Sequence, residues 1–439
     1  MKIVKANILT FIDDPFKVGD EAAYRYIKNG GVFIEKGIIQ AVDDFDILMK
    51  KIGNTVEVVD FSGNLLMPGF IDTHVHYPQT PMIAGYGEQL LEWLEKYTFP
   101  TELKFKDKAY AVSVAKKFLK FSLMAGTTTS VVYGTVYKDS VDAFFEESER
   151  LGTRMLCGKV WMDRNAPEDL LDNAETAYID SKALIEKWHK KGRQLYVITP
   201  RFAPSCSGEQ LQKAGELYQE YDDLYIQTHL CENKGEIAWV KELFPDRKSY
   251  TDVYDYYGLV QKRAIFGHCV HFNDDDYKTL HNQDASISHC PTSNLFLGSG
   301  LFDINRAKKG AYPVRLGLGT DIGAGTSFCH LQTLNEAYKV AQLRGQKLTA
   351  IQGMYLATRG GAESLSLENT IGSIQPECEA DMVVLDLRST PLLDYRMSQN
   401  KHLEESLFTE MIMADDRAIK ATIVNGKVVY NRDTGYFYE

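Results

Sequence analysis

The sequence predicts an α/β protein in which a (β/α)₈ barrel is joined to a small β-sandwich domain formed by both chain ends. Three observations lead to this prediction. Apolar strand-like segments alternate with longer helical patterns through the middle of the chain, short β-rich segments occupy its two ends, and histidines and carboxylates stand where the middle strands end. Alternation of this kind favours a parallel sheet, and eight such units favour closure into a barrel.

Eight segments carry the barrel prediction. Helical patterns, for example at residues 109–126, 140–152 and 208–221, separate most of them. An open doubly wound sheet is the alternative, but no G-x-G-x-x-G or Walker-type loop follows the first strand. The expected strands are residues 69–76, 127–134, 154–161, 194–202, 223–230, 264–270, 285–290 and 313–321.

The chain ends are β-rich in a different way. Lys36-Gly37 separates two apolar runs near the start, and Asn425-Gly426 does the same near the end, which is typical of hairpins. We expect residues 1–66 and 371–439 to form one small β-domain together, with residues 67–370 as the barrel.

Charge excludes some classes of partner. The 439 residues carry 60 acidic and 49 basic side chains, a net charge of −11, without a long run of Lys or Arg. Such a surface gains little from a polyanion, so we expect neither a nucleic acid nor a membrane as partner. A neutral or cationic small molecule fits better.

The start of the chain resembles neither a signal peptide nor a transit peptide, and no apolar run approaches roughly 18 residues. Seven cysteines, with no C-x-x-C pair, are typical of free thiols in a reducing compartment. We expect a cytoplasmic protein.

The stretch PGFIDTHVHYPQT contains the strongest site pattern. Asp72, His74 and His76 occupy alternate positions of the first expected barrel strand. Side chains alternate faces along a strand, so both imidazoles should point the same way. Two histidines on one face of a strand predict a functional site and are not typical of an ordinary surface strand.

Other strands end in similar groups. His229 ends the fifth strand, with Glu232 three residues later; His268 ends the sixth and Asp321 the eighth. Active sites of barrels lie at the C-terminal ends of the strands, so these groups should converge. His271 and His289 flank site strands and could support them, whereas His189, His281, His330 and His402 are interpreted as ordinary structural histidines.

Three neutral imidazoles and one carboxylate suit Zn²⁺, with Fe²⁺ the next choice. A catalytic zinc keeps an open position for water and lowers its pKa to roughly 7. Glu232 could then shuttle protons, and His268 could orient or stabilise the hydroxide. Hydrolysis is the reaction class that this set of residues predicts.

With these residues in place, the sequence resembles the metal-dependent amidohydrolase superfamily, and within it the guanine deaminase family. The similarity covers most of the chain. It is carried by PGFIDTHVHYPQ, YGEQLLEWLEKYTFPTE, VWMDRNAP, ITPRFAPSCS, THLCENKGEIAWVK, HCPTSNLFLGSGLFD and GLGTDIGAGTSFCHLQTLNEAYKV.

The resemblance implies roles for individual residues. His74, His76, His229 and Asp321 fall where the family binds one zinc, while Glu232, His268 and Asp321 fall at its catalytic positions. Gln79, Arg201 and Phe202 fall where the family holds the purine. The lysine that binuclear relatives use on the fourth strand is missing, which favours a single ion.

The implied activity is hydrolytic deamination of guanine to xanthine and ammonia in purine catabolism, by a homodimer. One alternative is an amidohydrolase acting on another aminated or halogenated heterocycle. Another is an inactive scaffold protein, which the presence of all six metal and water-activating residues disfavours.

Overall fold

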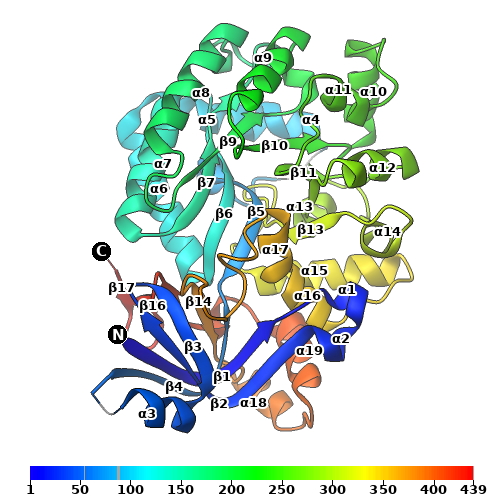
Figure 1. Cartoon of the computed structure of the whole chain (residues 1–439). Coiled ribbons are helices and arrows are strands. Elements are labelled where there is room, and N and C mark those ends of the chain that lie inside the picture. Colours follow the sequence, from blue (N-terminus) through cyan, green and yellow to red (C-terminus); the bar gives the residue numbers. More distant parts are fainter. Residues whose placement is uncertain (54, 87–88, 439) are drawn as a thin grey trace.

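The computed structural model describes residues 1–53, 55–86 and 89–438. Within this part of the chain, eight parallel strands close into a barrel (Figure 1). Closure comes from the pairing of Leu318 with Asp72 and of Tyr225 with Val197. In chain order the strands are β5 (Phe70–His76), β6 (Thr127–Tyr133), β7 (Arg154–Gly158), β9 (Leu195–Pro200), β10 (Tyr225–Leu230), β11 (Ala264–His268), β12 (Ser286–His289) and β13 (Arg315–Leu318).

All eight predicted barrel segments therefore contain a strand. The segment predicted as the third strand is interrupted after Gly158, and its last part forms β8 (Val160–Trp161), which pairs with β9. The predicted segments are longer than the observed strands at most C-terminal ends, because the chain there leaves the barrel wall to form the site.

Helices surround the barrel (Figure 1). The three predicted helical patterns correspond to α6 (Lys108–Met124), α7 (Lys138–Leu151) and α9 (Gly208–Gln219). The helices between and after the barrel strands are α4 (Leu90–Trp93), α5 (Phe99–Glu102), α6 (Lys108–Met124), α7 (Lys138–Leu151), α8 (Ala174–Trp188), α9 (Gly208–Gln219), α10 (Lys234–Leu243), α11 (Tyr250–Tyr256), α12 (Asp274–Asn282), α13 (Pro291–Phe296), α14 (Ile304–Lys309), α15 (His330–Leu343), α16 (Ala350–Leu356) and α17 (Arg359–Ser364). Shorter helical turns are η1 (Tyr77–Met82), η2 (Leu94–Thr98), η3 (Leu103–Lys106), η4 (Glu168–Leu170), η5 (Ala203–Ser205) and η6 (Asp416–Ala418).

Helix α6 shows how local sequence forms this layer. The Asp107 side chain accepts a hydrogen bond from Ala109 N (2.9 Å) and caps the helix start. Ala111, Ala115 and Phe118 recur every three or four residues and are buried, which gives the helix one apolar face. After the helix, Gly126 adopts φ +82°, a conformation that glycine reaches without strain, and β6 begins.

Both chain ends build the second sheet. In the described residues it has the order β17-β16-β15-β14-β4-β1-β2-β3. The prediction of a small β-domain made from both ends is confirmed, since β4 pairs with β1 on one side and with β14 on the other. The strands are β1 (Lys2–Phe11), β2 (Tyr24–Glu35), β3 (Ile38–Asp44), β4 (Glu57–Pro68), β14 (Met382–Leu385), β15 (Ile419–Val424), β16 (Lys427–Asn431) and β17 (Tyr436–Phe437), with helices α1 (Pro15–Val18), α2 (Asp20–Ala23), α3 (Phe45–Ile52), α18 (Pro391–Met397) and α19 (Leu403–Met413).

Successive side chains of β4 and β14 point to opposite faces of this sheet, and those on one face pack against the barrel. Leu65 and Met67 join the large apolar core that includes the barrel helices, whereas Leu66 between them joins a separate core inside the small sheet. Val383 and Val384 divide in the same way. One face of the sheet therefore supports the barrel and the other forms its own core. The division at residues 66/67 and 370/371 stays a prediction.

None of the helices in the described ranges has the length and apolar character that crossing a bilayer requires.

Candidate active site

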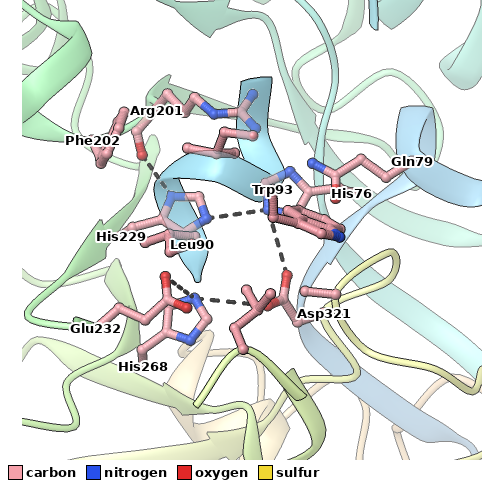
Figure 2. Close-up of a pocket in the computed structure, with 13 residues that line it drawn as sticks. His76, Gln79, Leu90, Trp93, Arg201, Phe202, His229, Glu232, His268 and Asp321 are labelled. Atoms are coloured by element: carbon pink, nitrogen blue, oxygen red, sulfur yellow. Dashed lines mark hydrogen bonds and ion pairs between the residues drawn. The ribbon is translucent and has the colours of Figure 1, made fainter. Parts of the chain in front are cut away.

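The predicted site residues meet in one cavity at the C-terminal ends of the barrel strands (Figure 2). The space among the lining side chains, counted to the open mouth of the cavity, is about 400 Å³. His74 does not line it but lies against the rings of His76 and His229. The other predicted residues line it directly: His76, Gln79, Arg201, Phe202, His229, Glu232, His268 and Asp321.

The distances among the imidazoles and one carboxylate fit a metal ion. The Nε2 atoms of His76 and His229 are 3.2 Å apart. Asp321 Oδ1 lies 3.4 Å from Nε2 of His74 and 3.6 Å from Nε2 of His76. Ligands at the usual bond lengths of tetrahedral zinc lie roughly 3.3 to 3.6 Å from one another, so this set matches such an ion.

A buried nitrogen without a hydrogen-bond partner also indicates a metal site. Among the described residues, Nε2 of His74 is buried and has no hydrogen-bond partner. A buried polar atom without a partner is costly unless something else binds it. The atoms close enough to share an ion form two overlapping sets, His74 with His76 and Asp321, and His74 with His229 and His268.

Hydrogen bonds on the far side of the rings orient two of the histidines. Nδ1 of His229 lies 2.6 Å from the carbonyl oxygen of Arg201 and donates to it. Nδ1 of His268 lies 2.9 Å from Oδ1 of Asn294. Each contact leaves Nε2 directed into the cluster, the arrangement that metal-binding histidines commonly show.

Protonation states also suit a cation. Burial, together with the neighbouring imidazoles, holds the pKa of His76 and His229 well below the ordinary value, so both rings are neutral and can act as ligands. Burial raises the pKa of Asp321, but His74 and His268 outweigh it and lower the pKa overall. The carboxylate therefore stays ionised.

Asp72 holds the backbone next to Asp321 in place. Its carboxylate accepts hydrogen bonds from the backbone N–H (3.0 Å) and the hydroxyl of Thr320, the residue before Asp321. Asp72 thus fixes the segment that presents Asp321. The sequence pattern placed it beside the two histidines but predicted no role for it.

Glu232 stands next to His268 on the opposite side of the cavity from Gln79 (Figure 2). Glu232 Oε2 is 3.5 Å from His268 Nε2, and Ser299 Oγ donates to Glu232 Oε1 at 3.1 Å. Burial raises the pKa of Glu232, while the nearby His268 opposes the shift. A carboxyl with a raised pKa next to an imidazole can both take up and release a proton.

Local sequence positions Glu232. The backbone N–H of Glu232 donates to Glu236 Oε2 (3.0 Å), and Asn233 together with Glu236 forms a capping box at the start of α10. Ser299 was missed by the sequence interpretation. It lies in a loop between two glycines, and only the folded structure brings it to Glu232.

The other end of the cavity carries groups suited to a flat heterocycle. Arg201 and Phe202 directly follow β9, and Gln79 lies in η1 after β5. Gln79 Oε1 accepts a hydrogen bond from Gly323 N at 3.1 Å. Leu90, Leu94 and Leu297 add apolar contacts alongside Trp93 and Ala324. An apolar slot with a few polar groups can hold an aromatic base and fix its orientation.

Glu102 is a further buried group that the sequence interpretation missed. It ends α5 and is fully buried, with Arg201 Nη1 2.9 Å from its Oε2. It lies in a motif that carried the resemblance, but on a helix away from any strand end, so the rule that located the other residues could not find it.

The remaining histidines lie outside the metal cluster. His271 Nε2 donates to the carbonyl oxygen of Ser299 (2.8 Å), which makes it a support for the residue that contacts Glu232. His289 is buried and stacks on Phe302, and His330 begins α15 and stacks on Phe70.

The seven cysteines all lie in described ranges, are buried and carry free thiols. Cys231 and Cys290, which stand inside site motifs, belong to neither possible metal set of the described residues.

Comparisons with known proteins agree with this geometry. Residues 65–429 match the model of the amidohydrolase family. Guanine deaminase of Escherichia coli (strain K12) is 50% identical over 429 residues, which cover 97% of this chain and 96% of that protein. Among solved structures, E. coli guanine deaminase has a TM-score of 0.96 at 49% identity, covering 98% of this chain and 100% of that one.

A guanine deaminase from C. acetobutylicum with bound guanine in the active site has a TM-score of 0.87 at 30% identity, covering 98% of this chain and 100% of that one. The fold, the cavity and these similarities lead to one assignment. The chain belongs to the amidohydrolase family, in the group that contains the guanine deaminases.

Proposed function

We propose that this protein is a guanine deaminase, which hydrolyses guanine to xanthine and ammonia. The observation that carries the proposal is the convergence of His76, His229 and Asp321 with Gln79 and Arg201 in one cavity of a chain half identical to a guanine deaminase. The same similarity disfavours another aminated or halogenated heterocycle as the main substrate.

We propose that His74, His76, His229 and Asp321 hold one metal ion, zinc in preference to iron. The nitrogen-rich ligand set and its separations support this choice. Zinc, when bound, lowers the pKa of a coordinated water to about 7 and so supplies a nucleophile at neutral pH.

The residues of the chain then have separate tasks. Glu232 takes the proton from the attacking water and passes it to a ring nitrogen and then to the departing amine. His268, 3.5 Å from Glu232, holds the oxygen that adds to C2 of the base. Water adds, ammonia leaves, and the carbon that carried the amine ends as the second carbonyl of xanthine.

Gln79, Arg201 and Phe202 bind the base. Gln79 offers both a donor and an acceptor, and the guanidinium of Arg201 donates to the ring carbonyl. Phe202 presents an aromatic side chain to the base. The cavity lies among buried side chains, so these hydrogen bonds form with little competition from water.

We further propose that the protein works as a homodimer in the cytoplasm. The free buried cysteines fit a reducing compartment. Sedimentation at several concentrations tests the dimer.

Incubation of purified, zinc-loaded protein with guanine tests the proposed activity. We expect equal amounts of xanthine and ammonia by chromatography and an ammonia assay. Consumption of guanine without ammonia, or no consumption, would contradict the proposal.

A further inference from the structure

Glu102 is an acidic side chain buried behind the base-binding end of the cavity. Its exposed fraction is 0%, and it does not line the cavity itself. The carboxylate belongs to α5, which follows η2 in the segment that also provides Trp93 and Leu94. A buried carboxylate needs charged or polar partners to offset the loss of water.

The partners of Glu102 are the residues proposed to bind the base. Arg201 Nη1 donates to both carboxylate oxygens, at 3.0 and 2.9 Å. Gln79 Nε2 donates to Oε1 at 3.2 Å. One carboxylate therefore joins two side chains that are 122 positions apart in the chain (201 minus 79).

These contacts set the orientation of the Gln79 amide. Its nitrogen faces Glu102, and its oxygen accepts from Gly323 N at 3.1 Å. A flip of the amide would place oxygen against carboxylate and nitrogen against an N–H group, so both contacts would be lost. The remaining N–H and lone pair of Gln79 are consequently presented to the base in one arrangement.

Glu102 also balances the positive charge of Arg201 and fixes its position. Arg201 is 2% exposed, and the central carbon of its guanidinium lies 5.9 Å from the centre of the Phe99 ring. Without a counter-charge, a buried cation beside a site for a divalent metal would be strongly disfavoured. With Glu102 in place the pair is neutral overall, and the remaining N–H groups of Arg201 act as fixed donors.

We propose that Glu102 is the positioning residue for base selectivity: it locks Gln79 and Arg201 in the arrangement that distinguishes guanine from bases with a different group at C6. This inference rests on the proposed guanine deaminase function. The hydrogen bonds and ion pairs that the described residues give Glu102 go to Gln79 and Arg201 and not to the proposed metal ligands or Glu232, so Glu102 acts on binding and discrimination and leaves the chemical step largely intact.

The test replaces Glu102 by Gln, which keeps the size and removes the charge. We expect KM for guanine to rise by about 10- to 100-fold, the range for losing hydrogen bonds to a charged group, with kcat changed by less than about 5-fold. The preference for guanine over 2,6-diaminopurine, which carries an amine at C6, should fall by a similar factor. Metal content should not change.

The matched control is Glu379→Gln, which removes the charge from another largely buried carboxylate that pairs with Arg154 and Arg193 away from the cavity. It should lower stability but leave KM and the preference between the two bases unchanged. A Glu102→Gln enzyme with the KM and preference of the wild type would overturn the inference.

A coupling measurement separates positioning from a general loss of stability. In an Arg201→Ala background, Glu102→Gln should add little to the rise in KM, because one of the two side chains that it orients is gone. Additive effects would overturn the inference.

If Glu102→Gln does not fold, Glu102→Asp is the second variant, because it withdraws the carboxylate by one methylene. It should show the same loss of preference for guanine, and an unchanged preference would overturn the inference. Failure of the wild type to deaminate guanine would instead remove the proposed function.

Discussion

The Nε2 atoms of His76 and His229 lie 3.2 Å apart, although the two residues are separated by 153 positions in the chain. His76 is buried and His229 partly buried, and loss of water around them, together with the neighbouring imidazoles, holds the pKa of each well below its ordinary value. Two neutral imidazoles directed at one point, beside the ionised carboxylate of Asp321, form part of the ligand set that we propose for the metal ion. Barrel closure, which joins β5 to strands late in the chain, creates this relationship.

We predict about one zinc or iron per chain and loss of both metal and activity in His74→Ala, because a ligand is removed. Elemental analysis and a guanine assay measure this. His402→Ala, which changes an exposed histidine, should keep both. Two ions per chain, or full activity in metal-free protein, would contradict the ligand assignment.

Chelation should remove activity while leaving most of the fold. The apolar cores of the barrel and of the small sheet are formed by aliphatic and aromatic side chains that need no ion, so circular dichroism should change little. Zinc added back should restore turnover. Unfolding of the whole chain upon chelation would mean that the ion is structural.

Glu232→Gln should keep the metal and lose about 10² to 10⁴ in kcat, the contribution of general acid–base groups. The amide preserves the shape but cannot carry the proton. Steady-state kinetics with metal analysis test this, and Glu242→Gln, at an exposed position of α10, is the control. A near-normal kcat would assign proton transfer to another residue.

Ser299→Ala should reduce kcat by about 10-fold, since the hydrogen bond from its hydroxyl to the Glu232 carboxylate is lost. Zinc content should be that of the wild type. A change in metal content in place of kcat would show that the loop supports the ligands instead.

Glu410 provides a pH test of stability away from the site. Burial raises its pKa to about 8, with further contributions from Asp386 and Asp415. Between about pH 4.5 and 8 the folded chain keeps a proton that the unfolded chain releases, so stability falls as pH rises through this window. Glu410→Gln should remove this contribution, which lowers the free energy of unfolding by about 2 kcal/mol between pH 6 and 8.

Unfolding by denaturant at several pH values measures this effect. The control is Glu405→Gln in the same helix, whose carboxyl is exposed. An unchanged pH dependence in Glu410→Gln would show that the carboxyl is accommodated in its charged form.

The sequence was sufficient for the barrel and for the residues at strand ends. Periodic apolar runs identify strands such as β5 and β10, and the barrel rule then places His76 and His229 at one end. Distances could not be predicted, because they depend on how the strands stagger around the barrel. The irregular pairing of β5 between Asp72 and Val75 is one example that no periodicity reveals.

Glu102 and Ser299 show the other limit. Both contact site residues from a helix or loop. Ser299 reaches Glu232 from 67 positions away, and Glu102 meets Gln79 and Arg201, which lie 23 and 99 positions away. No local pattern marks a buried carboxylate whose partners come from other elements. Such contacts follow only from the packed structure, although the segment containing Glu102 was already part of the family resemblance.

The most direct test of the account is a panel of bases given to the wild type and to Arg201→Ala, with ammonia release as the readout. The wild type should deaminate guanine and reject adenine and cytosine by roughly 10⁴ or more, since a site that binds the C6 oxygen leaves polar groups unpaired with other bases. Arg201→Ala should lose most of this preference, whereas Arg388→Ala, at an exposed position, should keep it. Comparable rates on adenine or cytosine, or no ammonia from guanine, would contradict the assignment.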